Sequence, residues 1–336
     1  MPAQYFADAG TPLMWLGCFQ LFFGNLLLGS FEAWLFARFT KKKPKASWIV
    51  GANYVSMIAG LWLPAYLAGL SPLVAQDPVR LGRLVLIGAF ALSFVITLAV
   101  EWPFFAASVD RFSFRGSVFR PMMLTNVVSY AGLLLVSMTI GSVSALTNLH
   151  PVSPADLRPL PGWVFYVAAD GLTVHRMRLD GTRDEVVGSL PPPKRKGDYW
   201  SMQLFFQEDF KSGLQDLYIG CNPESVAVRR GFKGRADDPE PNLNGRVYVR
   251  SFECSFTFIP GQQLRTGFWA REGLVVGDRR YALETPFLAM NWRSPTLLPD
   301  GHVLAVFGDA IMLIDPKSGQ VSKIGVGQAP AVLLDP

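Results

Sequence analysis

The stretch from Gly29 to Ser56 reads GSFEAWLFARFTKKKPKASWIVGANYVS, and it contains the features that decide the fold. An apolar run that includes Glu32 leads into a lysine-rich turn, and a second apolar run that includes Asn53 follows. Two apolar runs joined by a short basic loop are typical of a pair of membrane helices. The acid and the amide are unexpected in segments that would contact lipid, since polar groups are costly there.

Three further observations extend this interpretation to the first half of the chain. The 336 residues are 50% hydrophobic and only 17% charged, which is too apolar for an ordinary soluble enzyme. Four runs reach the roughly 20 apolar residues that a helix needs to cross a bilayer. They predict four transmembrane helices at about residues 12–37, 48–70, 84–107 and 121–146. Residues 1–12 hold no Lys or Arg, and the first run is too long for a signal peptide, so we expect it to be retained.

The distribution of cations predicts the orientation. The second predicted loop holds Arg80 and Arg83 with Asp77, whereas the first and third loops hold more cations, namely Arg38, Lys41, Lys42, Lys43 and Lys45, and Arg111, Arg115 and Arg120. The positive-inside rule then makes the first and third loops cytoplasmic. We expect a multi-pass protein of a bacterial cytoplasmic (inner) membrane, with its N-terminus and C-terminal domain outside. The lysines are interpreted as a topological anchor that meets anionic membrane lipids, and no nucleic-acid partner is expected.

A change in composition marks a second domain. The segment HPVSPADLRPLPG, from His150 to Gly162, carries four prolines, and short β-rich runs separated by turn signals replace the long apolar runs after it. We therefore predict a four-helix transmembrane domain over 1–149, a proline-rich linker over 150–162 and an extracytoplasmic all-β domain over 163–336.

The membrane half contains a repeat. Glu-Ala-Trp-Leu-Phe-Ala from Glu32 aligns with Glu-Trp-Pro-Phe-Phe-Ala from Glu101, and Asn-Tyr-Val-Ser from Asn53 aligns with Asn-Val-Val-Ser from Asn126. Because the rare polar residues coincide, we interpret the four helices as two copies of one hairpin, related by an axis along the membrane normal. The repeat predicts one intramembrane polar layer near the cytoplasmic leaflet, made of Glu32, Asn53, Ser56, Glu101, Asn126 and Ser129.

Three interpretations of this polar layer remain open. Glu32 pairs with Asn53, and Glu101 with Asn126, as hydrogen bonds that hold helices together. Alternatively, the two glutamates approach one another, share a proton and line a site for a proton or small cation. In the third interpretation, the layer belongs to an interface with another membrane subunit, because the small-residue pairs at 59–60 and 131–132 permit close helix approach.

The last domain shows two similar segments, WVFYVAADGLTVHRMRLDGT at 163–182 and HVLAVFGDAIMLIDPKSGQVSKIG at 302–325. In each, a β-run, a tight turn, a second β-run and a hairpin turn follow one another. Their separation of about 138 residues equals three steps of about 46, a length found in propeller repeats. The pattern resembles the β-propeller repeat families, although it lacks a Trp-Asp blade signature. The resemblance implies about four blade-like units and no particular ligand; a partial propeller completed by dimerisation and a β-sandwich are the alternatives.

Motifs for chemistry are scarce. The three histidines are isolated from one another, and neither zinc-site spacing nor a P-loop nor a nucleophile elbow occurs, so we expect no metal and no cofactor. A non-enzymatic role is favoured over that of a membrane-embedded enzyme. Cys221 and Cys254 either form a disulfide in the outer domain or are small buried residues. The sequence predicts a membrane-anchored binding or scaffolding subunit, acting through its β-domain on a protein partner or within a larger membrane complex. The alternative is a small transporter or proton-linked component that uses Glu32 and Glu101.

Overall fold

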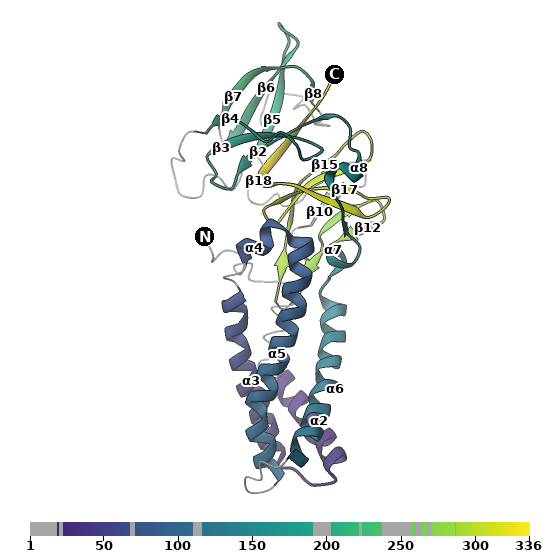
Figure 1. Cartoon of the computed structure of the whole chain (residues 1–336). Helices are drawn as coiled ribbons and strands as arrows, with labels where there is room; N and C mark the ends of the chain where they lie inside the picture. The colour runs from purple at the N-terminus through teal and green to yellow at the C-terminus, as the bar shows by residue number, and fades with distance from the viewer. Residues whose placement is uncertain are drawn as a thin grey trace. The chain divides into compact units, whose positions relative to one another are not determined.

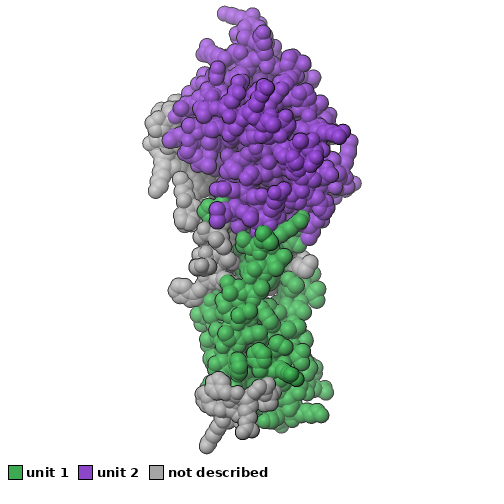
Figure 2. Space-filling view, in the orientation of Figure 1, with its two compact units in different colours: residues 1–72, 82–143, 284–289 green, residues 73–81, 144–283, 290–336 purple. Residues whose placement is uncertain are grey.

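The computed structural model describes most of the chain, namely residues 19, 23–67, 71–109, 116–190, 203–221, 224–236, 257–259, 264–267, 270–285 and 287–336. It divides into two compact units, which Figure 2 distinguishes by colour. The helical unit comprises residues 1–72, 82–143 and 284–289. The β unit comprises residues 73–81, 144–283 and 290–336.

Four long helices account for the apolar half of the chain. They are α2 (Asn25–Thr40), α3 (Ala46–Leu67), α5 (Pro78–Val109) and α6 (Gly116–Ile140), as labelled in Figure 1. Two of them contain segments long and apolar enough to cross a membrane, Pro78–Val109 in α5 and Val118–Ser137 in α6. The prediction of long apolar helices is therefore confirmed for these two. Most of the predicted run before α2 lies outside the described residues, as do Arg111 and Arg115.

The predicted fourth span is too long at its C-terminal end. Helix α6 ends at Ile140, and the short helix α7 (Ser144–Thr147) follows separately. The apolar run continues to residue 146, but Gly141 and Ser142 interrupt the helix, and Ser142 instead bridges Glu284 in an antiparallel arrangement. A backbone hydrogen bond from Ser142 N to Glu284 O, at 2.9 Å, replaces the next helical turn.

The outward faces of α5 and α6 are apolar. Leu84 and Ile87 on α5 are each 68% exposed, and Leu135 on α6 is 67% exposed. In the most apolar 18-residue stretch of each helix, only 17% of α5 and 28% of α6 is buried. A helix of a soluble protein buries its apolar stripe against neighbours and presents polar residues outward. Exposed apolar surface of this extent fits contact with lipid.

The core of the helical unit repeats the pattern seen in the sequence. Phe36 and Phe105, which align in the predicted repeat, are fully buried and meet edge to face with ring centroids 4.9 Å apart. Ile49 and Met122 pack against the same cluster, and each lies four residues before an asparagine of the polar layer. Aligned residues of the two hairpins thus occupy the same hydrophobic cluster.

The β unit is built from short antiparallel strands with one long strand at its centre. A nine-stranded sheet has the main order β15-β16-β17-β18-β2-β3-β4, and β1 and β8 also pair with β18. The strands of this sheet are β1 (His150–Pro151), β2 (Gly162–Ala168), β3 (Thr173–Arg178), β4 (Glu185–Ser189), β8 (Arg235–Ala236), β15 (Trp292–Leu297), β16 (Val303–Phe307), β17 (Ala310–Asp315) and β18 (Gln320–Leu334).

Smaller sheets and helices complete the list of elements. One sheet has the order β5-β6-β7, a second has the order β12-β11-β10-β9, and β13 pairs with β14. Their bounds are β5 (Gln203–Asp209), β6 (Leu214–Cys221), β7 (Glu224–Phe232), β9 (Thr257–Ile259), β10 (Leu264–Thr266), β11 (Leu274–Val276), β12 (Arg279–Tyr281), β13 (Leu283–Glu284) and β14 (Ala289–Met290). The short helices are α4 (Ser71–Gln76) and α8 (Pro154–Leu157).

The predicted proline-rich linker takes part in the β unit. His150 and Pro151 form β1, which runs parallel to β18. Ser153 is the N-cap residue of α8 and forms a capping box with Asp156. Proline at the first helical position suits this start, because its fixed φ is already helical. The segment is therefore held by hydrogen bonds along part of its length.

The long strand β18 joins two sets of strands that were predicted to form separate blades. Its first half pairs with β17 and its second half pairs with β2, so the predicted first and last blades share one strand. Gly327 lies near this change of partner, where a Cβ atom would overlap the Val167 carbonyl and the Tyr166 ring. Blades of a propeller are individual sheets around a channel, and the described strands show no such ring. The coarser prediction, a mostly β C-terminal part in antiparallel sheets, is confirmed.

Strand β2 is buried on both faces. Val164 and Tyr166 belong to one hydrophobic cluster with β3, β16, β17 and β18, whereas Phe165 and Val167 belong to a second cluster with β5, β6 and β7. Alternate residues of a strand point to opposite faces, so a continuous apolar run is expected where both faces are covered. The second cluster packs one sheet upon another.

Hairpin turns lie where the sequence predicts them. Gly171, Gly181, Gly308 and Gly319 all have φ between +67° and +79°, a region that favours glycine. Asp180, which precedes Gly181, accepts hydrogen bonds from Thr182 Oγ1 at 2.6 Å and from Thr182 N at 2.9 Å. The Thr182 hydroxyl, opposed by partial burial and aided by the backbone donor, holds the pKa of Asp180 below its ordinary value.

This shift predicts acid sensitivity of the β unit. A carboxyl group whose pKa is lowered by folding contributes stability above its unfolded pKa of about 3.9, and the contribution disappears as pH falls through the folded pKa. We expect the unfolding temperature of the β unit to fall between about pH 5 and pH 3. Asp180→Asn should reduce the size of that fall, as measured by thermal unfolding of the purified protein at a series of pH values. An identical pH profile in the variant would contradict the role of Asp180.

Candidate functional site

All six residues of the predicted polar layer are buried in the helical unit. The two carboxylates are the most unusual of them, because Glu32 is 2% exposed and Glu101 is 1% exposed among apolar helices. The remaining four, Asn53, Ser56, Asn126 and Ser129, are 8% exposed or less. Helix α2 supplies Glu32 and helix α5 supplies Glu101, while α3 and α6 each supply one asparagine and one serine.

The spacing of asparagine and serine places them on one helix face. Ser56 follows Asn53 by three residues on α3, and Ser129 follows Asn126 by three residues on α6. Residues three apart on a helix are neighbours on its surface. Each of these two helices therefore presents an amide and a hydroxyl group together.

The first carboxylate receives the amide of its own hairpin. Asn53 Nδ2 donates to Glu32 Oε2 at 2.5 Å, and it also lies 3.2 Å from the carbonyl oxygen of Ile49 in the preceding turn. Ser129, from the second hairpin, lies beside the Glu32 carboxylate. The predicted pairing of Glu32 with Asn53 is thus present.

The second carboxylate receives a hydroxyl group from the other hairpin. Ser56 Oγ donates to Glu101 Oε1 at 2.7 Å and lies 3.2 Å from the backbone oxygen of Asn53. Asn126 lies beside Glu101, but its Nδ2 donates to the carbonyl oxygen of Met122 at 3.2 Å. The prediction paired residues only within each hairpin, and so it missed the contacts that Ser56 and Ser129 make with the glutamate of the other hairpin.

The two carboxyl groups interact electrostatically. They lie close enough for the charge on Glu32 to act on Glu101. Within the part of the chain that the structure describes, Glu101 Oε2 and Asn126 Oδ1 are buried and have no hydrogen-bond partner. Both atoms are acceptors when Glu101 is ionised, so a proton or a small cation would supply what the two atoms lack.

A second polar contact next to this layer escaped sequence reasoning. Tyr130 follows Ser129 directly, and its hydroxyl oxygen lies 2.5 Å from Thr97 Oγ1 and 3.2 Å from the backbone oxygen of Ser93. Thr97 lies one turn before Glu101 and so on the same helix face. The repeat alignment concealed this pair, because Leu28 and Met57 stand at the equivalent positions.

A neighbouring pair of aligned positions makes a contact in both hairpins. Asn25 Nδ2 lies 2.7 Å from Met57 Sδ in the first hairpin. The residues that align with them, Phe94 and Tyr130, stack edge to face with ring centroids 5.0 Å apart. The same pair of aligned positions thus makes a contact in each hairpin, although the chemistry of the two contacts differs.

The other predicted sites add little. Cys254 lies outside the described residues, so its pairing with Cys221 stays a prediction. Among the described residues, no group of three or more His, Cys, Asp or Glu side chains is placed to hold a metal ion.

Comparisons of the chain with protein-family models, with curated proteins and with solved structures find no match.

Proposed function

We propose that the protein is a polytopic membrane protein whose helices, two copies of one hairpin, anchor a binding domain outside the cytoplasmic membrane. In this proposal the helical unit is a four-helix bundle and the β unit recognises a protein or another envelope component. The observation that supports this proposal is the polar layer, in which Ser56 of one hairpin donates a hydrogen bond to Glu101 of the other. A layer of this kind stabilises the bundle as one anchor.

The burial of the polar layer favours a role in holding the helices together over a role in lining an open pathway for protons or ions. Glu32, Asn53 and Glu101 are each 4% exposed or less, and their surroundings include the apolar cluster around Phe36 and Phe105. Buried polar groups in membrane helices usually pair with one another and add stability of about 0.6 kcal/mol for each contact. The pairing of the helices gains specificity, because a register that separates these polar groups would leave them without partners in apolar surroundings.

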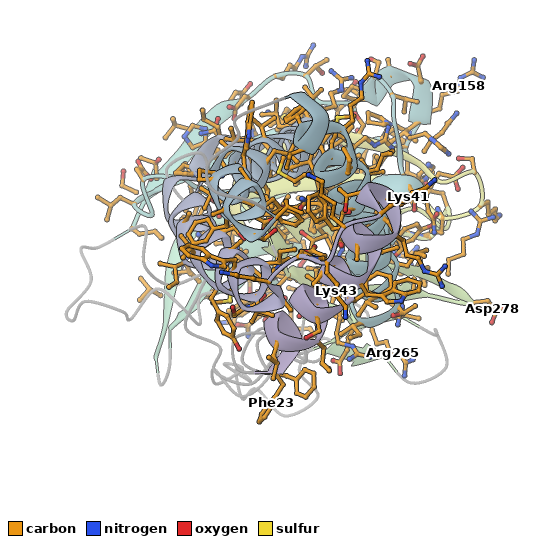
Figure 3. The ribbon with its side chains drawn as sticks, turned by 90° about the horizontal axis from the view of Figure 1, so that it is seen from below. Phe23, Lys41, Lys43, Arg158, Arg265 and Asp278 are labelled. Carbon is orange, nitrogen blue, oxygen red and sulfur yellow. The ribbon has the colours of Figure 1, made fainter. Side chains whose placement is uncertain are left out.

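The proposed orientation places the basic turn after α2 in the cytoplasm. Lys41 and Lys43 lie in that turn, and Figure 3 labels both. Positive charge next to a membrane segment favours the cytoplasmic side. The β unit then belongs to the outer side, which is the periplasm in a bacterium.

Labelling of single cysteines tests this orientation. In a background without the three native cysteines, Lys211→Cys in the β5–β6 hairpin should react with a membrane-impermeant maleimide in intact cells. Lys43→Cys should react only after the cells are lysed. The reverse pattern would overturn the orientation.

Site-specific cross-linking tests the binding role. Phe210, 91% exposed, projects from the β5–β6 hairpin, so a photoreactive residue in its place samples the surroundings of the β unit. Illumination of intact cells should give discrete adducts from such β-unit positions. Photoreactive residues at the lipid-facing positions Ile87 and Leu135 serve as controls and should give no adduct of the same mass. Absence of adducts from all exposed β-unit positions would contradict the proposal.

A second candidate function is proton or cation movement through the glutamate pair. It is favoured by the two unpartnered acceptors, Glu101 Oε2 and Asn126 Oδ1. A proton on Glu101 would give Asn126 a donor, and intramembrane acids often mark such relays. A pair of acids that holds one proton or one cation between them can exchange it when the surroundings change.

Glutamine variants separate the two candidates. If the layer only anchors, proteoliposomes of the wild-type protein should show no proton flux above empty liposomes, as followed with a pH-sensitive dye under an imposed potential. If the pair conducts, the wild type should show flux that Glu32→Gln and Glu101→Gln abolish at equal membrane abundance. Reduced abundance without any change in flux favours the anchor.

A further inference from the structure

A basic pocket lies in the β unit at the corner where the chain leaves the sheet of β5, β6 and β7. Strand β7 ends at Phe232, and after two intervening residues β8 begins and pairs with the end of β18 in the nine-stranded sheet (Figure 1). The pocket has a volume of about 260 Å³. Its lining combines residues of β2, β3, β7 and β18, namely Trp163, Phe165, Arg176, Arg229, Arg230, Gly231, Phe232, Lys233 and Leu333.

The local backbone brings three of the cations to one place. The pairing of β6 with β7 shifts register twice near Leu217, and Gly231 adopts φ +81°. Asp216 Oδ1 accepts a hydrogen bond from Gly231 N at 3.0 Å, which holds this bulge. A bulge redirects the side chains around it, and here Arg229, Arg230 and Lys233 all line the pocket.

The charges of the pocket are only partly compensated. Arg176 donates to Glu185 Oε2 through Nε at 2.9 Å and Nη2 at 2.6 Å, so its charge is neutralised. Arg230 Nε lies 3.8 Å from Asp216 Oδ2, a long contact for an ion pair. Arg229 and Lys233 have no acidic partner in the part of the chain that the structure describes. Among the described residues, no acidic side chain lines the pocket.

Aromatic rings stiffen the arginine side chains. The guanidinium carbon of Arg176 lies 4.4 Å from the centroid of the Trp163 ring, and that of Arg229 lies 5.8 Å from the centroid of the Phe232 ring. Such contacts reduce the number of conformations that an arginine explores before binding. A pre-arranged set of guanidinium groups loses less entropy when it binds an anion.

We propose that this pocket binds a phosphoryl group. The proposal names the ligand class for the binding domain and so rests on the proposed function. Three cations without full compensation match a group that carries about two negative charges, as a phosphate monoester does near pH 7. The planar guanidinium forks of Arg229 and Arg230 suit the bidentate geometry of phosphate oxygens, and the pocket volume admits a phosphate ester of modest size.

Inorganic phosphate is the probe for the test. The full-length protein is held in phosphatidylcholine nanodiscs at constant ionic strength, and thermal unfolding of the β unit is followed as phosphate is added. We expect a saturable rise in unfolding temperature with phosphate and none with acetate, which carries one charge. Arg229→Gln and Lys233→Gln should each weaken the apparent affinity at least about tenfold. Lys211→Gln, which removes an exposed cation outside the pocket, should leave it unchanged.

Two sources of the phosphoryl group are distinguished by a second arm. Stabilisation by phosphatidate included in the nanodiscs, lost in Arg229→Gln, with no effect of free phosphate, assigns the pocket to a lipid headgroup. Stabilisation by free phosphate alone assigns it to a soluble ester or ion. No effect of either, or equal effects in wild type and pocket variants, would overturn the proposal. If phosphate does not bind but a photoreactive residue at position 210 still gives cross-linked adducts, the proposed function stands and only the phosphate site is refuted. If phosphate binds but no adducts form, only the proposed function is refuted.

Discussion

Replacement of Phe165 by alanine will lower the free energy of unfolding of the β unit by about 3–5 kcal/mol. Phe165 is fully buried and packs edge to face against Phe206 and Phe232, with ring centroids 5.0 Å away in both cases. These rings join β2 of the nine-stranded sheet to β5 and β7. Their loss leaves a cavity between two rigid sheets, which cannot close without moving strands.

Hydrogen exchange of β2 and β6 amides in the full-length protein measures this loss during denaturant titration. The matched control is Phe210→Ala, because Phe210 is 91% exposed in the β5–β6 hairpin. A surface substitution of this kind should change stability by no more than about 0.5 kcal/mol. A loss below about 1 kcal/mol in Phe165→Ala would show that the two sheets do not share this core.

Replacement of Asn53 by leucine will destabilise the helical unit by about 1–3 kcal/mol. The amide of Asn53 donates to Glu32 Oε2, and its removal leaves a buried carboxyl group without that donor. The cost should exceed the roughly 0.6 kcal/mol average for a membrane hydrogen bond, because that average reflects pairs whose partners find substitutes. Reversible unfolding in bicelles by steric trapping measures it.

Two further variants establish the cause. Asn25→Leu is the matched control, since Asn25 is an equally buried amide whose acceptor is the weakly accepting Met57 sulfur. We expect it to cost less than about 1 kcal/mol. The double variant Glu32→Leu/Asn53→Leu should recover much of the loss, because replacing both partners by apolar groups leaves neither unsatisfied. Equal losses in Asn25→Leu and Asn53→Leu would show that the Glu32 contact has no special weight.

Parts of the site could be predicted because they depend on close spacing along the chain. The pairing of Glu32 with Asn53 follows from a short turn that places two helices side by side, and the aligned copy led to Glu101 and Asn126. The hydrogen bond from Ser56 to Glu101 joins different hairpins. To predict it, one would have to know which face of α3 is turned toward α5, and the sequence does not give this. The contact between Tyr130 and Thr97 could not be predicted from the repeat, because the aligned residues of the first hairpin, Leu28 and Met57, are apolar.

In the β unit too, features set by neighbouring residues were predictable, whereas contacts between distant segments were not. Turn positions such as Asp180-Gly181 were predictable, since a positive φ and a side-chain acceptor are properties of neighbouring residues. The shared strand β18 was not, because its partners β17 and β2 flank it at very different distances along the sequence. A spacing of about 46 residues suggested separate blades, and strand pairing joined the first and last of them in one sheet.

By itself, the sequence determined the apolar helices, the hairpin turns, the buried acid and amide, and the mostly β character of the second half. Each of these follows from the hydrophobicity, backbone sterics or hydrogen-bonding groups of residues close together in the chain. Only the tertiary structure decided which carboxyl group Ser56 meets, how β18 unites two sets of strands, and that Arg176 and Lys233 line one pocket. These contacts join residues far apart in the chain, and they form where packing of whole helices and sheets repays the entropy of bringing distant segments together.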